Sequence, residues 1–270
     1  MDYVMVIDVN KCIGCETCVV ACKDEHFDNE YPPYTAPQPE VGQFWIRVQM
    51  VERGTFPKVK LARVPIPCMH CDNPPCVAAA TGGAIYKRSD GIVIIDPAKS
   101  VGQRQLVDAC PYGVIYYNQD ADIPQKCAFC VHRLESGKTP RCVDACIATQ
   151  ALIFGDRADL KATIEEKGAV PLHPEYGAKP RVYYVGLPKT FIAGALVDSK
   201  GECLAGADVT ATDTASGTVV AKATSDTFGD FWLDGLDVNK TYDVAITSAG
   251  KTKTISVSLD TDKNLGDIQL

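Results

Sequence analysis

Cysteine is the residue type in this chain whose number and spacing point most directly to chemistry. The 270 residues include 13 cysteines, of which twelve lie between Cys12 and Cys146, while Cys203 stands apart. A disulfide-stapled secreted domain would be shorter and denser in cysteine, and an odd total cannot pair completely. Many thiols in a reducing compartment usually mean bound metal. The sequence therefore predicts cysteines that bind metal.

The first group of cysteines has the spacing of a bacterial ferredoxin. Two, two and three residues separate its members, which are Cys12, Cys15, Cys18 and Cys22. In two-cluster ferredoxins the first three bind one [4Fe–4S] cluster and the fourth binds the other. Three thiolates at three-residue intervals let one tight loop reach three irons, and Gly14 permits close approach of the backbone. This spacing predicts an iron–sulfur cluster.

Three further groups follow along the chain. The second is Cys68, Cys71 and Cys76, the third is Cys110 alone before Pro111, and the fourth is Cys127, Cys130, Cys142 and Cys146. Structural zinc would also accept four thiolates, and a thioredoxin-type pair would need two. The spacing of the first group favours a [4Fe–4S] cluster over zinc, and a redox pair does not need twelve companions.

The order of the four groups resembles the iron–sulfur subunits of the dimethyl sulfoxide reductase family of molybdenum enzymes. That resemblance implies four [4Fe–4S] clusters, with groups one and four, and groups two and three, exchanging their last cysteine. Four expected cysteines are absent here, and their places hold Ala80, Ser100, Gln103 and Leu106. All four would have served one cluster, so the resemblance implies three clusters.

The same resemblance divides the twelve remaining cysteines into three sets of four. Set one is Cys12, Cys15, Cys18 and Cys146; set two is Cys22, Cys127, Cys130 and Cys142; set three is Cys68, Cys71, Cys76 and Cys110. Cys203 is left over and is expected to be an ordinary thiol. His70 and His132 lie next to cysteines and are expected to be solvated or capping side chains, with a hydrogen bond to a cluster as the alternative.

Several stretches resemble, within that family, the small subunits of the pyrogallol–phloroglucinol transhydroxylases. They are Met5–Val9, Glu52–Pro57, Pro67–Cys71, Asp90–Val93, Cys110–Val114 and Lys179–Tyr184. The resemblance implies a large catalytic partner that holds molybdenum on two molybdopterin guanine dinucleotides and moves a hydroxyl group between polyhydroxylated benzenes. The alternatives are an electron-delivering subunit of another molybdenum reductase such as a catechol dehydroxylase, an autonomous polyferredoxin, and a zinc-stabilised interaction protein.

No residues of this chain form a recognisable catalytic site. There is no glycine-rich phosphate loop, no HExxH motif and no serine–histidine–aspartate arrangement in the sequence. We therefore predict a non-catalytic subunit, with the substrate site in the partner. Burying the negative charge of iron–sulfur clusters requires backbone N–H donors and nearby cations, which we expect around the cysteines.

The elements that must position the cysteines are short and mixed, as in an α+β protein. The resemblance implies a duplicated bacterial-ferredoxin-like domain with insertions over residues 1–155. We predict a hairpin at Tyr86 to Ile95 that turns on Ser89-Asp90-Gly91, and a helix from Asp156 to Gly168. Residues 169–190 hold four prolines and no strong periodicity, so 156–190 is predicted to be a helix and an extended linker.

The last 80 residues have a different pattern of apolar and polar residues. Seven short alternating runs separated by turn residues predict an all-β sandwich over residues 191–270. The segment resembles the carboxypeptidase-regulatory-like, Ig-like domains through Gly206-Ala207, Thr227–Phe231, Tyr242, Val244 and Ile246. It carries 12 acidic against 6 basic residues, and we expect a structural or docking role for it.

Composition excludes other classes. The formal net charge is −7 and 46% of the residues are hydrophobic, as in an ordinary globular protein without a basic surface for nucleic acid. No apolar run approaches 18 residues, and the first residues have neither a basic nor a long apolar segment. We therefore expect no membrane span and a cytoplasmic protein.

Overall fold

The computed structural model describes residues 1–270 and divides into two units. Unit 1 comprises Met1–Met50 and Arg63–Leu187, and unit 2 comprises Val51–Ala62 and Pro188–Leu270. The predicted boundaries differ from these in two places, because unit 1 continues through residues 156–187 and because residues 51–62 join the C-terminal unit. None of the helices combines the length and the apolar composition that a membrane crossing needs.

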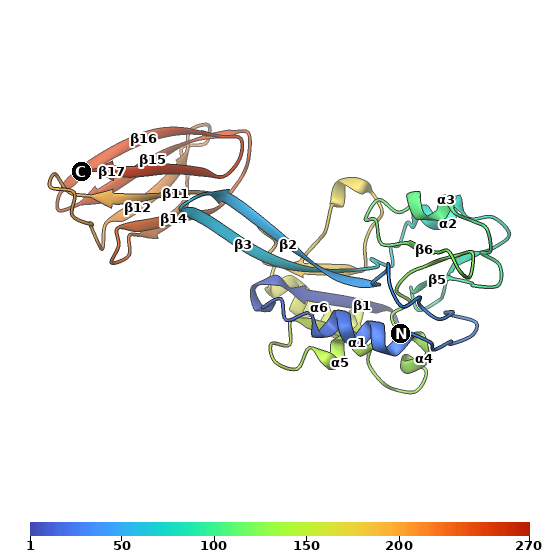
Figure 1. Ribbon diagram of the computed structural model, residues 1–270. Helices are drawn as coiled ribbons and strands as arrows, with labels where there is room; N and C mark the ends of the chain where they lie inside the picture. The colour runs from blue at the N-terminus through green and yellow to red at the C-terminus, as the bar shows by residue number, and fades with distance from the viewer. The chain divides into compact units, whose positions relative to one another are not determined.

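A four-stranded sheet forms the centre of unit 1 (Figure 1). Its strand order is β8 (Leu152–Asp156), β1 (Tyr3–Asp8), β10 (Val182–Val185) and β9 (Val170–Pro171). Strand β1 runs parallel to β10 and antiparallel to β8. Residues Val4 to Ile7 are fully buried, as expected for a continuous apolar run with both faces covered.

Strand β10 corrects the prediction of a linker over residues 169–190. Val182 pairs with Met5 of β1, and Val182 and Tyr184 are both fully buried. The prolines that indicated a linker lie at the margins, since Pro171 is on the edge strand β9 and Pro180 precedes β10. A buried strand of only four residues is too short for its period to stand out.

The remaining elements of unit 1 are short. They are η1 (Val9–Lys11), α1 (Thr17–His26), α2 (Pro75–Ala79), β4 (Ile85–Lys87), β5 (Val93–Ile95), α3 (Gln105–Asp108), β6 (Tyr116–Asn118), β7 (Ile123–Gln125), α4 (Val131–Leu134), α5 (Arg141–Ala145), α6 (Arg157–Glu166) and η2 (Pro174–Tyr176). The predicted hairpin is present as β4 paired with β5. The predicted helix is α6, which Asp156 caps by accepting a hydrogen bond from the Ala158 N–H.

A long hairpin belongs to both units. Strands β2 (Ile46–Thr55) and β3 (Lys58–Pro67) form a two-stranded ribbon (Figure 1). Its base is part of unit 1 and its tip, residues 51–62, is part of unit 2. Strand β3 ends at Pro67, directly before Cys68, so the ribbon leads into the second cysteine group.

Unit 2 contains the seven strands that the sequence predicts. They form a three-stranded sheet, β14 (Asp230–Leu236), β11 (Thr190–Val197) and β17 (Lys263–Gln269), and a four-stranded sheet, β13 (Val219–Thr224), β12 (Asp208–Asp213), β15 (Lys240–Ser248) and β16 (Lys251–Leu259). Side chains from both sheets make one apolar core that includes Ile192, Phe231, Val244 and Leu259. The alternation of buried and exposed residues in β12 and β15 follows from the period of two in a strand.

Acidic residues of unit 2 pair with the basic tip of the ribbon. Lys58 pairs with Asp230, Lys60 with Asp234 at 2.5 Å, and Arg53 with Asp262 at 2.8 Å. The negative charge predicted for the C-terminal segment is therefore partly balanced within its own unit.

Candidate metal centre

Set one gathers at the start of helix α1. Its four cysteines line one cavity, with Cys12 after η1, Cys15 and Cys18 around the first turn of α1, and Cys146 after α5. Gly14 in this loop has a φ of +72°, and a β-carbon there would collide with the Arg63 side chain. The positive φ favours glycine at this position.

Set two lies deeper. Its members come from α1, from the loop after β7 and from α5, and Cys22, Cys130 and Cys142 are buried. Burial raises the pKa of the Cys22 thiol well above its ordinary value, and the charges of the other three thiols of the set raise this pKa further. The backbone N–H of Phe129 donates a hydrogen bond to Cys127 Sγ at 3.4 Å. Three of the four thiols of set two are thus buried, and the other three members of the set lie near Cys22.

Set three lines an apolar cavity. Its cysteines follow β3, lie on α2 and follow α3, and all four face the same space. The other lining residues are Met69, His70, Pro74, Pro75, Val93, Pro111, Tyr112, Ile115 and Lys126. With prolines and aliphatic side chains around it, this space excludes water from any group that the thiols bind.

The environment of the thiols disfavours free thiolates at the buried positions. Burial raises the pKa of Cys18 to about 12 and that of Cys76 to about 11. The exposed Cys15 differs, because hydrogen bonds from the Thr17 hydroxyl, at 3.4 Å, and from the Thr17 N–H lower its pKa. Buried thiols of this kind become thiolates when a bound metal supplies positive charge.

The spacing of the side chains suits a multi-iron cluster better than a single ion. No three His, Cys, Asp or Glu side chains converge closely enough to hold one metal ion. Structural zinc would need four ligands around one point. In a four-iron cluster each thiolate binds its own iron, so the thiolates stand farther apart.

Two buried histidines supply a second test of whether the sites fit a cluster. His26 Nε2 lies 3.7 Å from Cys130 Sγ in set two. At His70 the Val93 N–H donates to Nδ1 at 3.0 Å, so the hydrogen of the neutral ring is on Nε2. That Nε2 is buried without a partner, and His70 lines the set-three cavity. A sulfur of a bound cluster is the acceptor this N–H lacks.

His70 and His132, the two histidines near cysteines in the sequence, lie in different environments. Burial, together with the charge of neighbouring cations, holds the pKa of His70 well below its ordinary value, so its ring stays neutral. His132 instead bonds Glu25 at 2.9 Å and stacks on Tyr31. His132 is therefore a partly buried, hydrogen-bonded side chain rather than a solvated or capping one, and His70 has the geometry of the alternative.

Comparisons with known proteins point to one family. The model of the 4Fe-4S dicluster domain matches residues 59–157, and that of the carboxypeptidase regulatory-like domain matches residues 192–270. The pyrogallol hydroxytransferase small subunit of Pelobacter acidigallici is 43% identical over 100% of this chain and 99% of its own. One subunit of the tetrathionate reductase of Salmonella typhimurium is 38% identical over 70% and 74%, respectively. The iron–sulfur subunit of the arsenate respiratory reductase of a Shewanella species is 30% identical over 67% and 94%.

This chain belongs to the iron–sulfur subunits of the dimethyl sulfoxide reductase family. Members of this family are the non-catalytic, electron-transfer subunits of molybdenum oxidoreductases, so the chain carries [4Fe–4S] clusters and works with a large catalytic subunit. The family and the electron-transfer role predicted from the cysteine groups are confirmed, as is the order of a cluster-binding domain followed by an Ig-like domain.

The places of the four missing cysteines are filled in this iron–sulfur subunit. Leu106 is fully buried in an apolar cluster against which Ala80 packs. Ser100 is also fully buried. The Gln103 side chain accepts from the Thr81 N–H at 3.1 Å and donates to the carbonyls of Thr81 and Lys99 at 3.2 and 3.0 Å. Aliphatic packing and amide hydrogen bonds occupy the region where a fourth cluster would need its ligands.

Two residues near the cysteine sets were not predicted individually. Lys126, next to Cys127, is buried and lines the cavity of set three, although a lysine before a cysteine carries no signal of burial. His26 has no cysteine beside it in the sequence, and only the folding of α1 brings it to Cys130. Cys203 is an exposed thiol in unit 2.

Proposed function

We propose that this chain is the three-cluster electron-transfer subunit of a molybdenum enzyme that acts on polyhydroxylated aromatic compounds. Sets one, two and three each hold one [4Fe–4S] cluster, and the partner holds molybdenum on two molybdopterin guanine dinucleotides. The observation that supports this proposal is that the four thiols of set one line one cavity and the four of set three line another, while the places of the fourth set are filled. The full-length likeness to a pyrogallol hydroxytransferase small subunit supports the substrate class.

The side chains of this chain do three things in that role. The twelve thiolates hold the clusters, which supply one-electron transfer when bound. The apolar lining of set three keeps water out, and the buried N–H of His70 provides a hydrogen bond toward sulfur. No residue here binds or converts an aromatic substrate, so the chemistry belongs to the partner.

We propose that the partner docks over set one. Cys15 is the exposed cysteine among the twelve, and Ile13 and Ile147 beside this set are 58% and 79% exposed. Large exposed apolar side chains next to a metal site indicate an interface. Ile147→Glu is expected to weaken association with the large subunit, measured by copurification, while Val101→Glu, at another exposed position of unit 1, is expected to leave it intact.

The net reaction of a transhydroxylase takes no electrons from outside its substrates. We propose that the clusters set or restore the oxidation state of the molybdenum rather than carry electrons in each turnover. The test is to purify the complex, poise it at the active oxidation state, and compare hydroxyl transfer between trihydroxybenzenes before and after the cluster iron is chelated. Unchanged turnover supports the activation role, and loss of turnover in a complex that keeps both its molybdenum and this subunit contradicts it.

The identity of the copurifying protein tests the function itself. A large molybdenum-containing subunit that transfers hydroxyl groups between polyhydroxylated benzenes supports the proposal. A large subunit that instead reduces its substrate, as the names of the tetrathionate and arsenate relatives indicate for those proteins, would replace the transhydroxylase by a reductase. A 29.1 kDa monomer with no partner would contradict both.

A further inference from the structure

One buried positive charge in this chain has no partner of opposite charge. Three basic side chains, Lys58, Arg181 and Lys126, are less than 9% exposed. Lys58 pairs with Asp230, and Arg181 pairs with Asp72 at 2.5 Å and with Asp2. Lys126, at 4% exposed, forms no ion pair, although it is the most deeply buried of the three.

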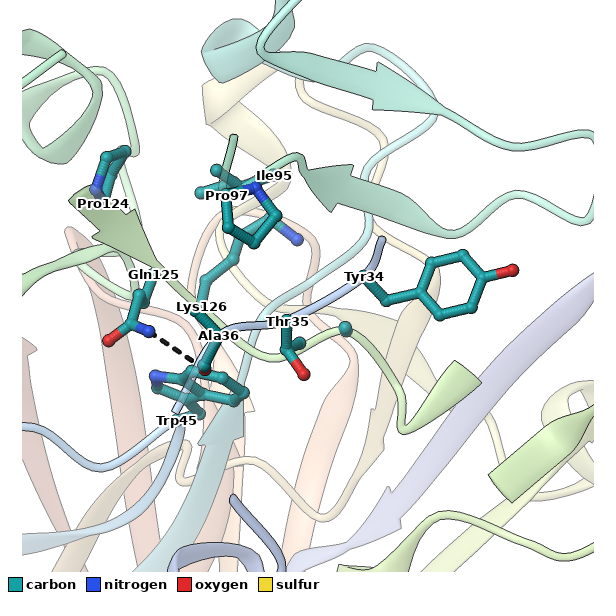
Figure 2. Close-up of a pocket in the computed structure, with 10 residues that line it drawn as sticks. Tyr34, Thr35, Ala36, Trp45, Ile95, Pro97, Pro124, Gln125 and Lys126 are labelled. Atoms are coloured by element: carbon teal, nitrogen blue, oxygen red, sulfur yellow. Dashed lines mark hydrogen bonds between the residues drawn. The ribbon is translucent and has the colours of Figure 1, made fainter. Parts of the chain in front are cut away.

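The contacts of Lys126 are backbone carbonyls. Its Nζ donates to the carbonyl oxygen of Val93 and, at 3.0 Å, to that of Cys127. An ammonium group has three hydrogens to donate, so one remains. Figure 2 shows its side chain among Trp45, Ile95 and Pro97, in a pocket with no acidic residue in its lining.

On another side Lys126 faces the cysteines of set three. It lines the same cavity as the four thiols of that set. From set two it contacts Cys127, and there the backbone carbonyl rather than the thiol. The charge is thus directed mainly at set three.

Energetics require an anion for this ammonium. An ion moved from water to a protein interior loses several kcal/mol of solvation, which two carbonyl hydrogen bonds only partly return. A cluster held by four thiolates is a net anion, and reduction adds one more negative charge. A fixed cation beside it therefore stabilises the cluster and stabilises its reduced state most.

We propose that Lys126 is the built-in counter-cation of the cluster in set three and raises the reduction potential of that cluster above the value it would have without this charge. The inference rests on the proposed function, because it requires a [4Fe–4S] cluster in set three. Lys126 is a positioning and tuning residue, since it touches no substrate.

The test compares two substitutions in the purified complex. Lys126→Met keeps the length and the apolar stem of the side chain but removes the charge, whereas Lys126→Arg keeps the charge. Iron and acid-labile sulfide are counted, and the cluster potentials are measured by redox titration followed by electron paramagnetic resonance. The paramagnetic resonance signal of the set-three cluster is identified as the signal that Cys76→Ser alters.

The expected result is that Lys126→Met lowers the potential of the set-three component and leaves the other two where they are, with the shift largely absent in Lys126→Arg. Loss of the set-three iron in Lys126→Met, with retention in Lys126→Arg, also supports the inference. Unchanged potentials and iron in Lys126→Met would overturn it, as would equal effects of the two substitutions, which would indicate packing rather than charge.

A matched control is available at the other buried lysine. Lys58→Met removes a charge that already has its carboxylate partner in Asp230, so it is expected to weaken unit 2 and to leave every potential unchanged. The iron count of the unsubstituted complex separates the two proposals. A complex without a cluster in set three would contradict the proposed function, whereas three clusters with no effect of Lys126→Met would contradict this inference alone.

Discussion

The interiors of the two units differ in what they require from outside the chain. Unit 2 fills its core with apolar side chains from both sheets, and its buried Lys58 has a carboxylate beside it. Unit 1 buries cysteine thiols in sets, leaves His70 Nε2 without an acceptor and leaves Lys126 without a counter-charge.

The difference shows which unit satisfies its buried groups with its own side chains alone. The side chains of unit 2 satisfy one another, so its stability comes from ordinary packing. Two unmatched groups of unit 1, the Nε2–H of His70 and the ammonium of Lys126, line the set-three cavity and are of both kinds that a cluster can satisfy, a donor without an acceptor and a cation without an anion. Unit 1 is therefore expected to depend on its bound clusters.

Removal of iron should produce the largest difference between the two units in the protection of their amides from hydrogen exchange. In the full chain, chelation is expected to abolish slow amide hydrogen exchange in α1, β1 and β10, because the clusters join the segments that carry their cysteine ligands. The strands of unit 2 are expected to keep their protection. Equal loss of protection in both units would show that they do not differ in this way.

Substitution of single cysteines should show the same contrast on a smaller scale. Cys76→Ser is expected to lower the iron content from about twelve to about eight per chain, since a [4Fe–4S] cluster normally takes four cysteine ligands. Cys203→Ser, at the exposed cysteine of unit 2, is expected to leave the iron content unchanged. Loss of iron in the second variant would contradict the assignment of the sets.

A cavity made in the core of unit 2 should lower the free energy of unfolding of that unit and leave the cluster potentials unchanged. Phe231 is 1% exposed, and its replacement by alanine is expected to cost about 3–5 kcal/mol. Hydrogen exchange in β11 and β14 of the full complex measures this loss, and the cluster potentials serve as the control. Phe228→Ala, at a position 73% exposed, is expected to change neither. A shift of the potentials in Phe231→Ala would mean that unit 2 influences the clusters.

Removing one of the paired charges of unit 2 should have the smallest effect on the free energy of unfolding. Asp262 accepts hydrogen bonds from Arg53 at 2.8 and 2.9 Å and from the Phe191 N–H at 3.1 Å. Asp262→Asn is expected to cost about 1–3 kcal/mol, because one buried acceptor for a charged donor is lost. The same exchange measurement applies, with Asp267→Asn, at an exposed position, as the control without effect. A cost above that of Phe231→Ala would mean that ion pairs rather than packing hold unit 2 together.

Local patterns predicted much of this architecture. The seven strands of unit 2 followed from period-two alternation with turn residues between the runs, and α6 lies within the helix predicted from Asp156 to Gly168. The first cysteine group predicted a cluster because its ligands lie within one loop. In each case the signal and the structure lie within a few residues of each other.

Features made by distant segments were missed. The pairing of β10 with β1 joins residues more than 170 positions apart, and the contact of His26 with Cys130 joins residues 104 positions apart. The β2–β3 ribbon was also not predicted, although apolar and polar residues alternate from Ile46 to Met50 and again from Lys58 to Leu61. The isolation of Lys126 from every carboxylate is a property of the whole fold and has no local signature.

The number of irons per chain tests the central claim most directly. In the purified complex, iron and acid-labile sulfide should each be present at about twelve per copy of this chain, since three sets of four cysteines hold three four-iron clusters. About sixteen would mean that a fourth cluster forms despite Ala80, Ser100, Gln103 and Leu106, and about eight or fewer would mean that one of the three cysteine sets holds no cluster.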